Sequence, residues 1–203
     1  MARAKRSPEA TEAMRRDLVA AARTLIASEG HKGLTARRLA AKLGWAVGTI
    51  YTIAPTLDVI VLEANAAELA DLRDALIAQD MKLTSGASPA DRLQAMAETY
   101  VAFAQSRAHN WAAIFEREAE GDPPEWYLAR QQELFDLAET LVRPLTDDDD
   151  AARRASRALW AALQGIAALA MAGHLGRVSA AGAEDLANYL VQTIIAGLKA
   201  TQT

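Results

Sequence analysis

The amino-acid sequence predicts an all-α protein of about nine helices, with an N-terminal helix-turn-helix unit followed by a larger helical bundle. Alanine supplies 47 of the 203 residues, whereas glycine supplies 11 and proline 6, and this balance favours helices. Apolar residues recur at spacings of three and four along most of the chain, and no segment shows sustained alternation with a period of two. The length suffices to bury a substantial core without disulfides or a structural metal.

Capping residues, glycines and prolines predict where the helices begin and end. Ser7, Pro8 and Glu9 form a helix start, and Gly30 closes that helix. A second start, with a capping serine, a proline and an acid at the third helical position, occupies residues 88–91. The other helices are expected at about 35–43, 47–52, 56–82, 111–118, 125–143, 151–175 and 183–200.

Charge is divided sharply along the chain. Residues 1–54 hold ten Lys or Arg and four Asp or Glu, a net charge of +6, whereas the remaining 149 residues hold 12 and 22, a net charge of −10. A basic N-terminal segment on an acidic body indicates contact with a polyanion. The alternative is a chance asymmetry, in which Arg3, Lys5 and Arg6 form a solvated tail.

The composition excludes several classes of site. Cysteine is absent, which excludes thiolate metal sites, thiol catalysis and disulfides and suits a reducing cytosol. No apolar run approaches the roughly 18 residues of a membrane span, and no secretion signal is visible, so a cytoplasmic protein without a membrane partner is expected. His31, His109 and His174 match no metal spacing, and no nucleophile is paired with a base. We therefore expect no enzyme, no metal and no cofactor.

The run of four acidic residues at positions 147–150 could be interpreted as a metal site or as a helix cap. Four consecutive carboxylates do not converge on one point, and they stand where a helix N-terminus favours negative charge. Pairs at i,i+4 are expected from Asp149 to Arg153 and from Asp150 to Arg154. The run is therefore interpreted as a helix cap.

Two short helices near the N-terminus have the proportions of a helix-turn-helix. Gly44 permits the tight turn between them. Their small shared core is expected to consist of Leu39, Ala40, Leu43, Val47 and Ile50. The residues expected to face outward are Arg37, Arg38, Lys42, Gly48, Thr49, Tyr51 and Thr52. Such donors suit phosphates and base edges, so residues 1–54 are predicted to bind the major groove of DNA.

At these residues the sequence resembles a known family. Residues 33–44, read as GLTARRLAAKLG, and residues 48–51, read as GTIY, are similar to the DNA-binding domain of the tetracycline-repressor (TetR) family. The resemblance implies a bacterial homodimeric transcriptional regulator, usually a repressor released from a near-palindromic operator by a small molecule and found on the nucleoid when operator-bound. It implies that Thr35 holds a phosphate and Arg37 reaches a base edge. By the same resemblance Thr49 and Tyr51 grip the DNA backbone, and Val47 and Gly48 face bases, with Arg38 and Thr52 beside them.

The sequence departs from the family just after this motif. Members usually carry a histidine, an aromatic residue and a phosphate-binding lysine where this chain has Ile53, Ala54 and Leu57. The alternative to a DNA-binding regulator is therefore a helical ligand-binding protein of the same fold with weakened or lost DNA binding.

Residues 55–203 are expected to sense a ligand and to dimerise. Trp160, Gln164 and Gly165 resemble a Trp…His-Gly pattern of one branch of the family, with Gln164 at the histidine position. The candidate pocket consists of Met96, Tyr100, Phe103, Trp111, Phe115, Trp160, Gln164 and Met171. This lining favours a small, mostly apolar or aromatic effector. The alternatives are that the aromatic residues form core and that Gln164 bonds an internal partner.

The last two helices are the candidate dimer interface. The final helix carries an apolar stripe, and small residues in the helix before it allow close approach, so two helices from each subunit are expected to form a four-helix interface. The predicted interface consists of Ala158, Ala161, Ala162, Gly165, Leu186, Tyr189, Leu190, Thr193, Ile194 and Gly197. The alternative is that the stripe packs within one subunit.

Overall fold

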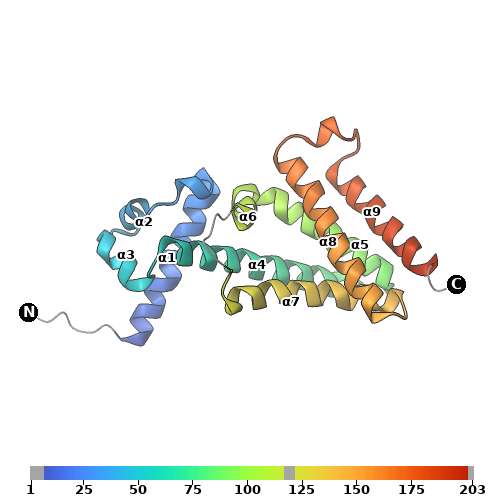
Figure 1. Cartoon of the computed structure of the whole chain (residues 1–203), viewed down its shortest axis with the longest axis horizontal. Helices are drawn as coiled ribbons and strands as arrows, with labels where there is room; N and C mark the ends of the chain where they lie inside the picture. Colours follow the sequence, from blue (N-terminus) through green and yellow to red (C-terminus); the bar gives the residue numbers. More distant parts are fainter. Residues whose placement is uncertain (1–6, 117–121, 201–203) are drawn as a thin grey trace, which may run out of the picture. The chain divides into compact units, whose positions relative to one another are not determined.

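The computed structural model describes residues 7–116 and 122–200, and within these ranges the chain is helical throughout, with no strand (Figure 1). The α-helices in the described ranges are α1 (Pro8–Glu29), α2 (Ala36–Leu43), α3 (Val47–Ile53), α4 (Leu57–Lys82), α5 (Pro89–Ser106), α6 (Ala108–Phe115), α7 (Glu125–Val142), α8 (Asp149–Met171) and α9 (Ala183–Ala200). Short 3-10 turns follow α1, α7 and α8. The predicted all-α class is confirmed.

Local signals account for most helix ends. The Ser7 hydroxyl caps α1, and Gly30 ends it with a φ of 72°. At the start of α5, Ser88 and Asp91 form a reciprocal capping box. The hydroxyl and the backbone N–H of Ser88 both donate to the Asp91 carboxylate. These hydrogen bonds, and above all the one from the hydroxyl, hold the pKa of Asp91 below its ordinary value.

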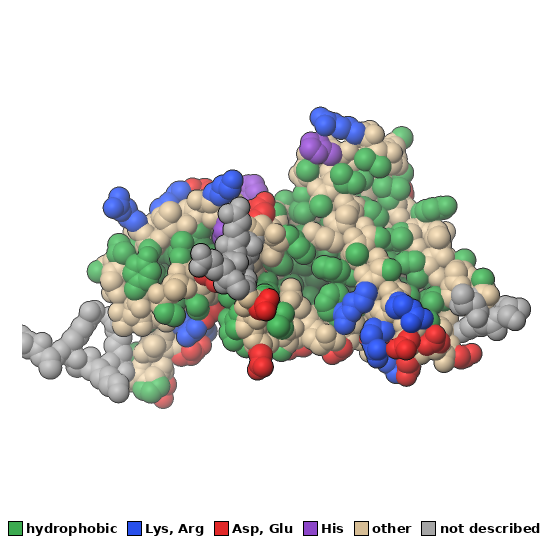
Figure 2. Space-filling model, viewed as in Figure 1, with side chains coloured by type: hydrophobic (Ala, Val, Ile, Leu, Met, Phe, Trp, Pro, Cys, Tyr) green, Lys and Arg blue, Asp and Glu red, His purple; other side chains and the backbone are tan. Residues whose placement is uncertain are grey.

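The start, the end and the ion pairs of α8 differ from the sequence prediction. Asp148 accepts the backbone N–H of Asp150 at 2.8 Å, so the acidic run does cap a helix, and α8 begins two residues earlier than expected. The helix ends at Met171 rather than near 175, just before Gly173, which has a φ of 68°. The predicted i,i+4 pairs are wrong. The closest partners are instead Asp150 with Arg153, Asp149 with Arg143, and Asp148 with Arg154, and acidic and basic side chains mix over this end of α8 (Figure 2).

The middle of the chain differs from prediction at one further boundary. The sixth helix begins at Ala108, three residues before the expected start, because α5 ends at Ser106 and a single residue, Arg107, separates the two helices. Its expected end at residue 118 lies outside the described residues.

The chain divides into two compact units. The first unit comprises Met1–Glu68 and His109–Tyr127, and the second comprises Leu69–Ala108 and Leu128–Thr203. The helix α4 therefore begins in the first unit and ends in the second, and α6 belongs to the first. The functional boundary between residues 54 and 55 stays a prediction.

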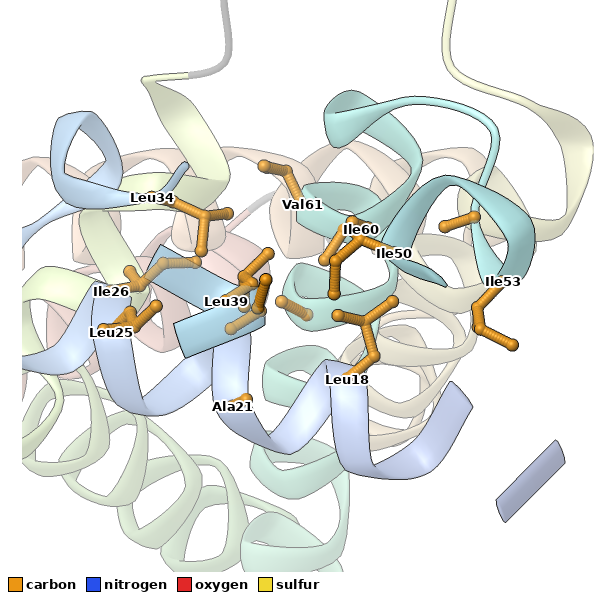
Figure 3. Close-up of a cluster of buried hydrophobic side chains, with 14 of the residues drawn as sticks. Leu18, Ala21, Leu25, Ile26, Leu34, Leu39, Ile50, Ile53, Ile60 and Val61 are labelled. Atoms are coloured by element: carbon orange, nitrogen blue, oxygen red, sulfur yellow. The ribbon is translucent and has the colours of Figure 1, made fainter. Parts of the chain in front are cut away.

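The first unit has one apolar core, to which α1, α2, α3, α4 and α6 contribute. Figure 3 shows Leu18 of α1, Leu39 of α2 and Ile50 of α3 among its side chains, and each is fully buried. Gly44 has a φ of 67° and turns the chain between α2 and α3, as predicted. The expectation that Val47 joins this core is wrong, because its side chain is 41% exposed.

A buried polar network also ties α1, α4 and α6 together within the first unit. Glu68 of α4 is only 1% exposed, and its carboxylate accepts hydrogen bonds from Arg23 at 2.8 Å and from Asn110 at 2.7 Å. Asn65, also buried, donates to the backbone carbonyl of Ala113 at 3.2 Å. A buried charge requires such partners, so these residues fix how the three helices pack.

The second unit is built on α5, α8 and α9, which pack on one another. Their buried side chains include Leu93, Val101, Leu159, Leu163 and Val191. An ion pair at 2.7 Å between Arg73 and Glu133 links the later part of α4 to α7. Among the described residues, no single helix has both the length and the apolar character to cross a membrane, although the bent pair of α3 and α4 passes that test jointly on length and composition.

Candidate DNA-binding surface and effector cavity

The helix α3 presents one face to its core and the other to solvent. Ile50 and Ile53 are buried and anchor the helix. Val47 and Tyr51 are 41% and 50% exposed, and Gly48 and Thr52 are exposed beside them. The Thr52 hydroxyl donates to the backbone carbonyl of Gly48 at 2.8 Å. In a helix-turn-helix the exposed face of the second helix is the face that enters the major groove.

One predicted DNA contact does not face outward. Thr49 is only 7% exposed, so the expectation that it points to solvent is wrong. Residues four apart share a helix face, and Thr49 therefore lies on the same side as buried Ile53. Its neighbours Gly48 and Tyr51 remain on the outer side.

The predicted contacts of α2 are accessible but not equally available. Thr35 is exposed, and its hydroxyl accepts the backbone N–H of Arg38 at 3.3 Å as the helix cap. Arg37 is exposed. The Arg38 guanidinium is engaged by the Glu29 carboxylate and also donates to the backbone carbonyl of Gly33 at 3.4 Å. Of the two neighbouring arginines, Arg37 is the one without a carboxylate partner among the described residues.

The net charge of residues 1–54 overstates what this surface offers to phosphates. Three of its arginines form ion pairs within the first unit: Arg15 with Glu63, Arg23 with Glu68, and Arg38 with Glu29. The Glu63 carboxylate raises the pKa of Arg15 by accepting its hydrogen bonds. Within the described ranges, the cations of this segment without an ion pair are Arg16, Lys32, Arg37 and Lys42. Arg3, Lys5 and Arg6 lie outside the described residues.

The three departures from the family motif all serve packing. Ile53 and Ala54 are buried in the core of the first unit, and Leu57 packs against it. Apolar side chains at these positions therefore hold α3 and the start of α4 against α1, at the expense of a phosphate contact at position 57.

An apolar cavity lies in the second unit. Its lining consists of Leu72, Leu76, Met96, Tyr100, Leu134, Phe135, Ala138, Ser156, Leu159, Trp160 and Leu163. No charged side chain is among them. The free space is about 40 Å³, which corresponds to a few water molecules. Any effector larger than that requires these side chains to move.

The structure unites part of the predicted pocket. Met96, Tyr100 and Trp160 line the cavity, and the Tyr100 hydroxyl donates to the Gln164 side-chain carbonyl at 2.7 Å. Gln164 thus has an internal partner, which was one of the two alternatives. Phe103 and Met171 are not part of the lining.

The expectation that all eight residues share one cavity is wrong. Trp111 and Phe115 lie on α6, which packs into the first unit, and they form an edge-to-face pair with ring centroids 5.9 Å apart. Trp111 is buried there, whereas Phe115 is partly exposed.

Sequence reasoning missed the contribution of α7 to the cavity. Phe135 stands edge-to-face with Trp160 at 5.3 Å between ring centroids, and the Arg157 guanidinium lies 3.5 Å from the Phe135 ring centroid. Leu134, Phe135 and Ala138 recur at helical spacing in the sequence, and this pattern could have indicated that one face of α7 is buried.

The predicted dimer residues remain accessible in the protomer. None of the ten is buried, and Tyr189 is 71% exposed. Added Cβ atoms at Gly165 and Gly197 would meet no atom within 4 Å. An open groove runs between α8 and α9, lined by Ala151, Arg154, Ala155, Ala158, Ile194, Gly197 and Leu198. Leu186, Leu190 and Ile194 are partly covered by their own subunit, so the stripe packs internally at one side only.

The comparisons with known proteins agree with this arrangement. The structure is similar to a protein of unknown function from Rhodococcus sp. RHA1, with a TM-score of 0.73, 21% identity, and coverage of 91% of this chain and 94% of that chain. A TetR-family transcriptional regulator from Streptomyces coelicolor matches with a TM-score of 0.71, 16% identity, and coverage of 95% and 84%. RolR, solved with the ligand resorcinol, matches with a TM-score of 0.68, 16% identity, and coverage of 96% and 93%. No curated protein matches the sequence.

A match to a family model identifies the family more specifically than these structural similarities do. The model for the tetracyclin repressor-like C-terminal domain matches residues 93–194, which is half of the chain. The helix-turn-helix precedes that region, as the family's order of domains requires. The branch suggested by Trp160, Gln164 and Gly165 stays a prediction. The chain belongs to the tetracycline-repressor family of DNA-binding transcriptional regulators.

Proposed function

We propose that this regulator is a homodimeric repressor that binds a near-palindromic operator through residues 1–54 and is released by a small apolar or aromatic effector bound within residues 55–203. The observation that carries the DNA-binding part is the exposed outer face of α3, held by the buried Ile50 and Ile53. Regulators of this family are in general not enzymes. If the effector weakens operator binding by a given factor, the operator weakens effector binding by the same factor.

The operator is tested by a randomised-site selection with the full chain. We expect a two-fold symmetric consensus, and log affinity should fall linearly with log salt at about −0.9 per phosphate contact. Arg37→Ala should cost about 1–3 kcal/mol per half-site and relax the preference at one position, because Arg37 is the exposed guanidinium of α2 without an ion pair. Tyr51→Phe should weaken binding more evenly across sequences.

Lys82→Ala is the matched control for that experiment. Lys82 is an exposed cation at the far end of α4, and its removal should leave the consensus and the affinity unchanged. A selection that yields no sequence preference would favour the second candidate function, a ligand-binding protein with lost DNA binding. The observation that favours this second candidate is Leu57, which packs against the core where family members place a phosphate-binding lysine.

The effector site is tested with one substitution in the cavity lining and one of the residue that Tyr100 bonds beside it. The lining is apolar, with polar groups confined to Tyr100, the buried Ser156 hydroxyl and the ring nitrogen of Trp160, so a small, neutral and mostly apolar compound is favoured. The match to RolR, which was solved with resorcinol, supports a screen of simple phenols and small aliphatic compounds. Trp160→Ala and Gln164→Ala should alter the response to a hit by about tenfold or more, since a large aromatic wall or its neighbouring amide is lost.

Operator affinity without effector should stay unchanged in both variants. Trp126→Ala, which removes an exposed tryptophan on α7 outside the cavity, is the control and should respond like the wild type. Wild-type responses from both cavity variants would place the effector elsewhere.

A further inference from the structure

The outer face of α3 is unusual for a helix that reads bases, because the hydrogen-bonding groups of its exposed side chains are limited to the hydroxyls of Tyr51 and Thr52. Its exposed residues are Ala46, Val47, Gly48, Tyr51 and Thr52, none of which is charged or an amide. The Thr52 hydroxyl already donates to the Gly48 carbonyl. Figure 2 shows apolar side chains gathered on the surface over this helix. The N-terminal end of α3, which meets base edges in a helix-turn-helix, is therefore a surface of methyl groups and bare backbone.

Gly48 is not required by the fold. Its φ is not positive, and an added Cβ would meet no atom within 4 Å. Glycine inside a helix is less stable than alanine, so an unforced glycine here needs another reason. A missing side chain lets the backbone of α3 come closer to a ligand on that side. Val47, directly before Gly48, is 41% exposed and projects from the same end of the helix.

Among the four bases, thymine alone presents a methyl group in the major groove. Guanine presents acceptors, and cytosine and adenine present amino donors. An apolar side chain pressed against such polar groups leaves them without a hydrogen-bond partner, which is unfavourable. An aliphatic surface therefore discriminates in favour of thymine without forming any hydrogen bond.

We infer that Val47, with Ala46 beside it and Gly48 permitting close approach, selects thymine in each half-site by contact with the C5-methyl group. The inference deepens the proposed function and rests on it, since it concerns how the same surface recognises the operator. It assigns the preference for thymine to Val47, whereas Arg37 on α2 accounts for the preference at a different position of the half-site.

The test begins with the duplex that the randomised-site selection yields. Each thymine of the half-site is replaced in turn by deoxyuridine, which removes the methyl group and leaves base pairing intact. We expect one or two positions at which the replacement weakens binding about fourfold per half-site, the effect of one buried methyl group. Replacement in both half-sites of a symmetric site should give about 15-fold. In Val47→Ala the same replacement should matter less than about twofold, because the contacting methyl groups of valine are gone.

Gly48→Ala provides an independent arm. The variant should melt at the same or a higher temperature than the wild type, because the added Cβ has open space and alanine favours helix. It should nevertheless bind the selected duplex about tenfold more weakly, since the new methyl group stands between α3 and the bases. Equal binding by Gly48→Ala would overturn the close approach.

Two results would overturn the assignment of Val47. One is sequence-specific binding that is unchanged by deoxyuridine at every position. The other is a deoxyuridine effect that persists in full in Val47→Ala, which would place the methyl contact on another residue. A selection without any sequence preference is a different outcome, because it removes the proposed operator function and this inference with it.

Discussion

Leu190→Arg is expected to convert the proposed dimer into monomers and, with it, to abolish binding to a two-fold symmetric operator. Leu190 lies on the accessible stripe of α9 and is only partly covered by its own subunit. In a four-helix interface the arginine would be buried without a partner, at a cost of about 3–5 kcal/mol for each copy. Sedimentation velocity at micromolar concentration measures the first effect, and titration of the selected duplex measures the second.

Two further variants separate this effect from misfolding. Gly197→Arg places the same charge where the protomer leaves open space, so the subunit should stay folded while the dimer dissociates. Gln192→Arg changes an exposed residue of α9 outside the stripe and should remain dimeric. A monomeric wild type at micromolar concentration would contradict the proposed interface, and dimeric Leu190→Arg and Gly197→Arg would place the interface on another surface.

Arg23→Met is expected to lower the free energy of unfolding by about 3 kcal/mol, although position 23 lies in neither the proposed DNA surface nor the cavity. The side chain of Arg23 is 25% exposed, whereas that of its partner Glu68 is 2% exposed. Methionine preserves the apolar stem of arginine but removes the charge. The Glu68 carboxylate then keeps the hydrogen bond from Asn110 and loses the ion pair with Arg23. Urea denaturation followed by circular dichroism measures the loss.

The matched control is Arg38→Met. This substitution removes the pair between Arg38 and Glu29, whose side chains are 46% and 34% exposed, so the expected loss is below about 1 kcal/mol. Adding Glu68→Gln to Arg23→Met should restore much of the stability, because a buried charge that no longer has Arg23 beside it is removed while an acceptor for Asn110 remains. Equal losses from Arg23→Met and Arg38→Met would show that the burial of Glu68 does not determine the loss of stability.

The helices and the helix-turn-helix were predictable because their signals are local. Ser7, Gly30 and Gly44 act within a turn of their own positions. Ser7 begins a helix, Gly30 ends it, and Gly44 turns the chain between two helices, whatever surrounds them. The family resemblance also depends on a short stretch of sequence, residues 33–44 and 48–51. The sequence shows that residues 53, 54 and 57 are apolar, but it does not show that their side chains pack in or against the core of the first unit.

The residues that were placed wrongly depend on contacts between distant segments. Thr49 and Val47 are two positions apart on a short helix, and which of them is buried depends on how α3 meets its neighbours. Trp111 and Phe115 have the same aromatic character as Trp160, and no local pattern indicates that α6 belongs to the first unit rather than to the lining of the cavity. The pairing of Arg23 with Glu68 spans 45 residues, a separation at which spacing carries no information.

The packing of α6 has a consequence for building chimeric regulators. Ala113 belongs to the same core as α1 to α4, and Asn110 supplies one of the hydrogen bonds to the buried Glu68 carboxylate. A cassette cut at residue 54 would therefore lose Glu68 and part of the apolar core, and one cut at residue 68 would keep the Glu68 carboxylate without the hydrogen bond from Asn110. A transplant of this DNA-reading module onto another sensor needs to carry the segment around α6 with it, or to receive an equivalent helix from its new host.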